Sequence, residues 1–180
     1  MYGLVNKAMK DLIEKKFGGV VWQQICQEAG YEDISFIAMQ SYPDELTYNL
    51  LGSASRVLNI PAANLLEEFG KYWVLYTADE GYGEMLKAAG NSLPEFLQNL
   101  DMLHTRVGNL MPKLDPPSFE CSDITDDSLT LVYRSNRQGL TPMVVGLLKG
   151  LGSRFGKECE VTVLDSNEDH GSQVSFRVEW

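Results

Sequence analysis

The chain has 180 residues, 44% of them hydrophobic, so it can bury a substantial core without disulfide bonds. Acidic residues outnumber basic residues by 25 to 15, and the net charge is −10. A surface of that sign repels phosphate backbones and anionic headgroups, which makes nucleic acids and membranes poor candidate partners. We find no transmembrane run and no signal-peptide pattern at the N-terminus. Three widely spaced cysteines argue for a reducing compartment, so we expect a cytoplasmic protein.

Helical patterns fill the first two thirds of the chain. Apolar spacing, together with glycine and proline as stops and starts, predicts helices over residues 3–17, 20–29, 44–58, 61–78 and 80–89. A further helix begins at Ser92, which forms a capping box with Glu95 around Pro94. It is expected to run to about Leu110 as one element, with His104 on its apolar face.

After Pro116 and Pro117 the hydrophobic period changes from helix to strand. Strands are expected over residues 118–124, 128–135, 158–164 and 173–180, with one helix over residues 141–155 between the two pairs. Helices segregated from a β-β-α-β-β antiparallel sheet make an α+β fold. The length favours one compact domain.

The chain has two histidines, and they lie in different settings. His170 falls in a predicted turn and is expected to be solvated. His104 faces the core side of its helix, where it is either a hydrogen-bonded structural histidine or a metal ligand. No second histidine or cysteine stands near it, so a tetrahedral zinc site is a poor match. A haem iron is a better match, because the porphyrin supplies four ligands and the protein needs one.

A second candidate group is the segment from Tyr133 to Arg137. On an extended chain, side chains alternate with period two, so Tyr133, Ser135 and Arg137 project to one side. All three can donate to carboxylate oxygens, and a haem carries two carboxylates on one edge. The alternative interpretation is the end of a surface strand with incidental polar groups. An apolar-face histidine combined with this row describes the parts of a haem pocket.

With these residues in view, the whole chain resembles the haem nitric oxide/oxygen-binding (H-NOX) domain, which is also found in the β subunit of soluble guanylate cyclase. The resemblance begins at the segment Met1-Tyr2-Gly3-Leu4-Val5-Asn6. It continues through Leu103-His104-x-Arg106-Val107, Pro116-Pro117 and Tyr133-x-Ser135-x-Arg137 to the β-β-α-β-β ending. The length is similar to that of stand-alone bacterial members. The resemblance implies a single domain with a helical distal subdomain (residues 1–62) and a proximal α+β subdomain (residues 63–180), with haem buried between them.

The resemblance also implies a role for each site residue. The cofactor would be non-covalent haem b, with Fe(II) in the sensing state and His104 as the proximal iron ligand. Tyr133, Ser135 and Arg137 would bind the haem propionates, and Pro117 would press on the macrocycle. The distal side, where gas binds, would be lined by Val5, Met9, Trp73, Met143 and Leu147.

The gas preference follows from one distal position. Family members that hold O2 stably place a tyrosine where this chain has Met143, which is a poor hydrogen-bond donor. We therefore expect binding of NO and CO, and little binding of O2, with Trp73 as the one distal donor that could change this. NO weakens the bond from iron to the proximal histidine in this family, so release of His104 would start signal transduction. The effector would be a separate protein: a histidine kinase, a cyclic-dinucleotide enzyme or a chemotaxis protein.

Three other classes remain open at this point. The chain could be a non-haem module for another apolar carboxylate, which would need Tyr133, Ser135 and Arg137 but not His104. It could be a haem enzyme, although peroxidases and dioxygenases need distal acid-base groups that are not evident, so no enzyme is expected. It could be an interaction protein in which His104 is structural. An absorption spectrum of the purified protein distinguishes these classes from a haem sensor.

Overall fold

The computed structural model describes residues 1–32, 34–167 and 172–180, and the chain divides into two compact units, Met1–Phe69 and Gly70–Trp180. The division falls inside helix α4 (Ala62–Thr77). The expected subdomain limits of residues 1–62 and 63–180 stay a prediction. His170 lies outside the described residues, so the expectation of a solvated turn there also stays a prediction.

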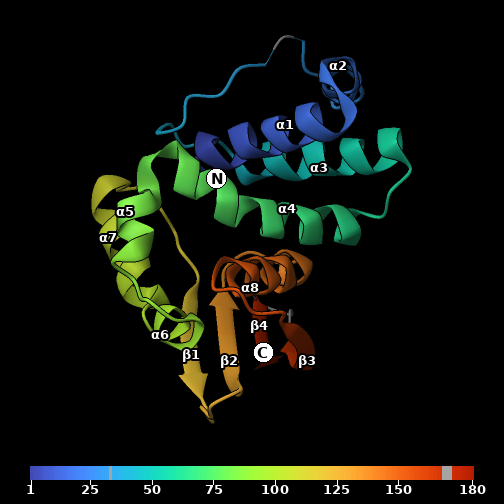
Figure 1. The fold of residues 1–180 in the computed structure, drawn as a ribbon. Coiled ribbons are helices and arrows are strands. Elements are labelled where there is room, and N and C mark those ends of the chain that lie inside the picture. Colours follow the sequence, from blue (N-terminus) through green and yellow to red (C-terminus); the bar gives the residue numbers. More distant parts are fainter. Residues whose placement is uncertain (33, 168–171) are drawn as a thin grey trace. The chain divides into compact units, whose positions relative to one another are not determined.

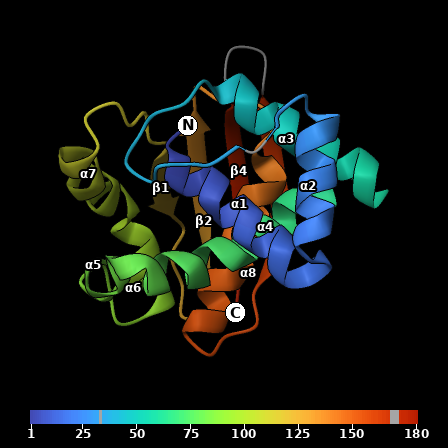
Figure 2. The ribbon, with the colours of Figure 1, turned by 90° about the horizontal axis from the view of Figure 1, so that it is seen from above.

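The first unit is a group of helices (Figure 2). It contains α1 (Gly3–Phe17), α2 (Gly19–Glu28), α3 (Asp44–Leu58) and the start of α4, close to the expected ranges. Gly18, at φ 90°, separates α1 from α2 with a backbone conformation that favours glycine. A buried polar contact joins α1 to α3, because the Thr47 hydroxyl donates to Asn6 Oδ1 at 2.8 Å.

The second unit begins with the rest of α4 and a distorted turn. The helix expected over residues 80–89 is instead a π-helical turn (Ala78–Tyr82) followed by the short helix α5 (Gly83–Lys87). Gly81 has φ 94°, outside the helical region, and it kinks the chain at this point. The sequence pattern alone did not indicate the kink.

The helix expected from Ser92 to Leu110 is two helices, α6 (Leu93–Gln98) and α7 (Leu100–Leu110). Asn99 leaves the helical conformation, with ψ 6°, and its side-chain amide donates to the carbonyl of Ala89 at 2.8 Å. The capping prediction holds in part: Glu95 N donates to Ser92 Oγ at 3.4 Å. The Glu95 carboxylate, however, accepts from the backbone of Asn91 and not from that of Ser92.

Four antiparallel strands and one helix complete the second unit (Figure 1). The strands are β1 (Ser118–Ser122), β2 (Ser128–Ser135), β3 (Glu160–Asn167) and β4 (Ser172–Glu179), in the order β1-β2-β4-β3. Helix α8 (Thr141–Arg154) lies in the sequence between the two strand pairs. This is the predicted α+β fold with a β-β-α-β-β order. β1 is shorter than predicted because Asp123, at φ 48°, ends it.

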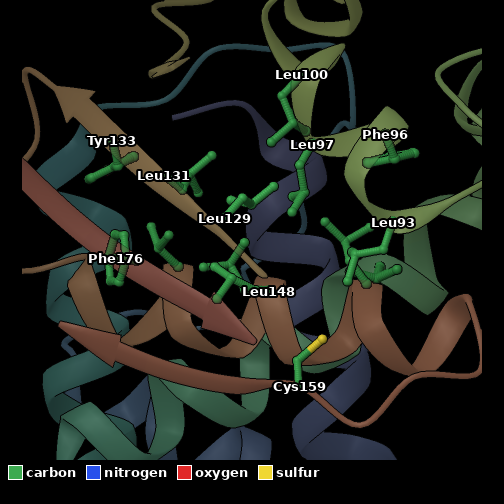
Figure 3. Packing of buried hydrophobic residues seen from close by; sticks show 14 of the residues in the cluster. Leu93, Phe96, Leu97, Leu100, Leu129, Leu131, Tyr133, Leu148, Cys159 and Phe176 are labelled. Atoms are coloured by element: carbon green, nitrogen blue, oxygen red, sulfur yellow. The ribbon is translucent and has the colours of Figure 1, made fainter. Parts of the chain in front are cut away.

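The core of the second unit lies between the sheet, α8 and the helices α6 and α7. The register pairs Leu131 with Phe176 and Tyr133 with Val174, so alternate side chains of β2 and β4 point the same way. Figure 3 shows these side chains converging with those of the helices. The labelled residues are Leu93, Phe96, Leu97, Leu100, Leu129, Leu131, Tyr133, Leu148, Cys159 and Phe176. One core thus supports both the helix of His104 and the strand of Tyr133. Among the described residues, no helix is long and apolar enough to cross a membrane.

Candidate functional site

His104 lies on α7, and its ring is packed against Phe119 of β1. The two ring centroids are 5.6 Å apart and the planes are 21° apart. The Nδ1 atom of His104 is buried and has no hydrogen-bond partner within the described part of the chain. Burial lowers the pKa of the imidazole below its usual value, and the nearby carboxylate of Asp101 opposes that shift. The imidazole is therefore neutral at pH 7, which is the form that binds metals.

Asp101 ties the helix of His104 to the sheet. It lies one helical turn before His104, and its Oδ1 accepts from the backbone N–H of Phe119 at 2.7 Å. Because β1 begins at Ser118, this bond fixes the start of the strand against α7. Asp101 also acts on the thiol of Cys121: burial, with a smaller contribution from that carboxylate, raises the thiol pKa to about 11.

The ring of Phe119 also contacts Tyr133, which stands opposite it in the register of β1 and β2. Their ring centroids are 5.5 Å apart, with the planes tilted by 43°. Tyr133 is almost fully buried, at 2% exposure. Phe119 therefore links the two predicted site residues His104 and Tyr133 in one continuous row of rings.

The prediction that Tyr133, Ser135 and Arg137 lie along one extended segment assumed that the strand continues to Arg137. In the structure, Ser135 and Arg137 do not share one extended segment. β2 ends at Ser135, and Arg137 lies in the bend that follows. The bend is held by hydrogen bonds: the N–H of Arg137 donates to Ser135 Oγ at 3.1 Å. Arg137 Nη1 donates to the carbonyl of Asp115 at 2.6 Å. Arg137 is thus brought beside the strand end by local contacts rather than by strand alternation.

Pro117 is half-buried and lies between Asp115 and the first residue of β1. Asp115 is held from two sides, since its carboxylate also accepts from Asn136 Nδ2 at 3.2 Å. The segment that carries Pro117 is therefore anchored both to the bend after β2 and, through Phe119, to α7. The predicted contact of Pro117 with a macrocycle stays a prediction.

Three of the predicted distal residues lie on helices that pack closely together. Trp73 is on α4, and Met143 and Leu147 are on α8. The helices approach at Gly70, where an added Cβ would collide with the Met143 carbonyl and lie 2.7 Å from Leu147 N. Close packing of this helix pair thus requires the glycine. Trp73 stacks on Tyr76, with ring centroids 6.4 Å apart.

The other two predicted distal residues belong to the first unit. Val5 is half-buried and Met9 is buried, and both are on α1. Their assignment to a gas pocket stays a prediction.

Sequence reasoning missed Phe119, Asp101 and Ser172, although the first two carried some signal. Asp101 is three residues before His104 and so lies on the same helical face. Phe119 stands between the polar residues Ser118 and Glu120, the alternation expected of a core-facing strand residue. Ser172 is 4% exposed, and its hydroxyl donates to the carbonyl of Arg137 at 2.8 Å. Nothing in the local sequence marked that long-range contact.

The donor set fits a cofactor that brings most of its own ligands. Within residues 1–32, 34–167 and 172–180, no group of three His, Cys, Asp or Glu side chains could hold a metal ion. His104 instead offers a buried nitrogen with no hydrogen-bond partner, in apolar aromatic surroundings. Phenol, hydroxyl and guanidinium donors lie on the adjoining strand and bend. A haem needs these groups: one axial donor and partners for two carboxylates.

Comparison with known proteins points the same way. A family model described as Haem-NO-binding matches residues 2–163. The soluble guanylate cyclase gcy-37 of Caenorhabditis elegans is 32% identical over 173 residues, covering 94% of this chain and 24% of that protein. The soluble guanylate cyclase gcy-35 of the same organism is 31% identical over 175 residues, covering 94% and 25%. The chain spans about a quarter of the length of the curated relatives it matches.

Solved structures share the fold. An H-NOX protein from S. oneidensis in the Fe(II)NO ligation state has a TM-score of 0.88 at 17% identity, covering 99% of this chain and 98% of that one. An oxygen-binding H-NOX domain related to soluble guanylate cyclases, in its oxygen complex, has a TM-score of 0.84 at 19% identity, covering 99% and 94%.

Proposed function

The chain belongs to the Haem-NO-binding family of haem-based gas sensors, and we propose that it holds the iron through His104, binds NO and CO with little O2, and signals by releasing His104. The cofactor is haem b, bound without covalent attachment and ferrous when it senses. Residues 2–163 are expected to have no catalytic role, because the family that they match is one of sensors.

The observation that carries the proposal is the buried Nδ1 of His104, which has no partner among the described residues. A buried polar nitrogen left in that state costs about 1–3 kcal/mol. A structural histidine is held by hydrogen bonds, so its burial normally comes with a partner. A neutral imidazole in apolar surroundings is suited to bind a metal ion.

The carboxylate edge of the cofactor would be held by Tyr133, Ser135 and Arg137. Arg137 can hold one carboxylate bidentately, while the phenol of Tyr133 and the hydroxyl of Ser135 each donate one hydrogen bond. Pro117 would press on the macrocycle from the segment between β1 and Asp115, whose carbonyl accepts from Arg137. When bound, haem supplies four porphyrin nitrogens and an iron with one position left for a diatomic gas.

The gas preference rests on Met143, by the resemblance to family members with a tyrosine there. A thioether cannot donate a hydrogen bond, so Met143 gives no help to O2, which gains most from a donor beside it. Val5, Met9 and Leu147 are likewise apolar. Trp73 carries the one indole N–H in the proposed set, and its ring lies against Tyr76.

Signalling would begin when NO frees His104 from the iron. The attachments of α7 described above include the Asp101 bond to Phe119 N and the buried side chains of Leu100 and Leu103. If ligand binding changes the contacts of α7, it shifts the equilibrium between two conformations of the protein. Such a shift is what a switch requires. The effector proposed is a separate histidine kinase, cyclic-dinucleotide enzyme or chemotaxis protein.

An absorption spectrum of the reduced protein tests the proposal. We expect a Soret band that shifts on addition of NO and of CO, and no stable oxy-ferrous spectrum in air. His104→Ala should lose the band of the histidine-bound form, whereas His170→Ala, the matched control at the other histidine, should keep it. A colourless protein would favour a non-haem module for apolar carboxylates, and a haem spectrum unchanged in His104→Ala would contradict His104 as the iron ligand. A stable oxy-ferrous spectrum in air would contradict the gas preference alone.

A further inference from the structure

Ser172 is the first residue of β4, and it reaches across to the bend that carries Arg137. In the register of β2 and β4 it pairs with Ser135, the last residue of β2. Its side chain is buried, at 4% exposure. The hydroxyl donates to the main-chain carbonyl of Arg137 at 2.8 Å. The bend is therefore attached to a strand that is distant in sequence. The attachment lies just beyond Ser135, where the pairing of β2 with β4 ends.

Arg137 needs such an attachment more than its two predicted companions do. Tyr133 and Ser135 belong to β2, whose ladder to β4 fixes their backbone. Arg137 lies beyond the ladder. Its main chain is held by two hydroxyls, because Ser135 Oγ accepts from its N–H and Ser172 donates to its carbonyl. The guanidinium is in turn aligned on the carbonyl of Asp115.

We propose that Ser172 is a positioning residue for the carboxylate site, fixing the Arg137 main chain so that its guanidinium meets a haem carboxylate. This rests on the proposed function. Loss of the hydroxyl releases the Arg137 carbonyl and lets the bend turn, and the guanidinium then spends less time in the orientation that a bidentate carboxylate contact needs. The ligand class is a carboxylate, and Ser172 itself touches Arg137 and not the ligand.

The test compares haem with its dimethyl ester, which has the same macrocycle but no free carboxylates. Each form is bound to the reduced protein, and its rate of transfer to an excess of a haem-scavenging apoprotein is measured. The ratio of the two rates, ester over free acid, gives the preference of the protein for the free carboxylates. Ser172→Ala should lower that preference about fivefold, the effect of one hydrogen bond. Ser172→Thr, which keeps the hydroxyl, should retain it. In an Arg137→Ala background, Ser172→Ala should have no further effect.

Ser128→Ala is the matched control at the other end of β2. Ser128 is as buried as Ser172, and its hydroxyl accepts from Arg177 Nη2 at 2.7 Å. The Ser128→Ala variant should be less stable but should keep the preference for the free-acid form of haem over its dimethyl ester. An equal fall in Ser128→Ala, or an unchanged preference in Ser172→Ala, overturns the positioning role while leaving the proposed function intact. If Ser172→Ala does not fold, Ser172→Cys removes most of the donor strength at similar size and should lower the preference. A wild-type protein that binds neither macrocycle overturns the proposed function itself.

Discussion

The imidazole of His104 and the ring of Phe119 lie nearly parallel, 21° apart, with 5.6 Å between their centroids. Phe119 in turn contacts Tyr133, and its backbone N–H is bound by Asp101. The imidazole therefore faces a ring that is fixed on its other side and at its main chain. This arrangement restricts rotation of the imidazole about its own side-chain bonds.

Phe119→Ala should free that rotation. We expect the free energy of unfolding, measured in urea, to fall by about 2 kcal/mol. This loss is smaller than that for a fully buried phenylalanine, because Phe119 is half-buried. In the reduced, haem-loaded protein the iron–histidine stretching band should broaden. Phe155→Ala is the control, since Phe155 pairs with Phe96 instead of His104. It should lower stability without broadening the band, and an equal effect on the band would contradict an orienting role for Phe119.

Met143→Tyr should create an O2-binding protein, because it places a hydroxyl donor at the position from which we infer the gas preference. Met143→Phe supplies the same ring without the hydroxyl and should leave O2 binding weak. Spectra of the reduced variants in air, followed over time, measure the effect. Stable O2 binding by both variants would show that pocket size and not the donor decides the preference.

Gly70→Ala should destabilise the chain by about 2 kcal/mol, because the new Cβ meets the backbone of α8, which cannot move as a flexible side chain can. Gly108→Ala is a control within α7, where nothing lies within 4 Å of the added Cβ. It should stabilise by about 0.5–1 kcal/mol, the usual gain from replacing glycine inside a helix. Urea unfolding of both variants checks the difference in sign.

The thiol of Cys121 should react slowly with iodoacetamide in the folded chain. Burial raises its pKa from 9.0 to about 11, so at pH 8 the thiolate is about a hundredfold scarcer than in the unfolded chain. Because the folded pKa is the higher one, the stability contributed by Cys121 is present below pH 9 and is lost as the pH rises towards 11. Mass spectrometry of alkylation in buffer and in urea measures the ratio. Equal rates in both would contradict the burial of this thiol.

The sequence predicted most of the second unit because its signals are local. Alternation in β2 and β4 placed Leu131, Tyr133 and Phe176 on the core side, and the structure buries all three. The order of elements and the α+β class are confirmed for the same reason. The fold of relatives with 17–19% identity agrees with that outcome.

Two of the errors arise where a side chain binds a distant main-chain group. The break at Asn99 depends on the carbonyl of Ala89, which no helical periodicity reports. The setting of Arg137 depends on Asp115 and Ser172, which are far from it in sequence. Period-two reasoning gave a row of three donors, but only two of them belong to the strand. The roles of the site residues themselves remain predictions.

The interruption at Asn99 has a mechanical consequence for α7. A single uninterrupted helix from Leu93 to Leu110 would transmit a displacement of His104 directly to the core residues of α6. The structure instead has two shorter helices, α6 and α7, which meet at Asn99, and the side-chain amide of Asn99 donates to the carbonyl of Ala89. If release of His104 moves α7, the break at Asn99 is the point where α7 can bend relative to α6.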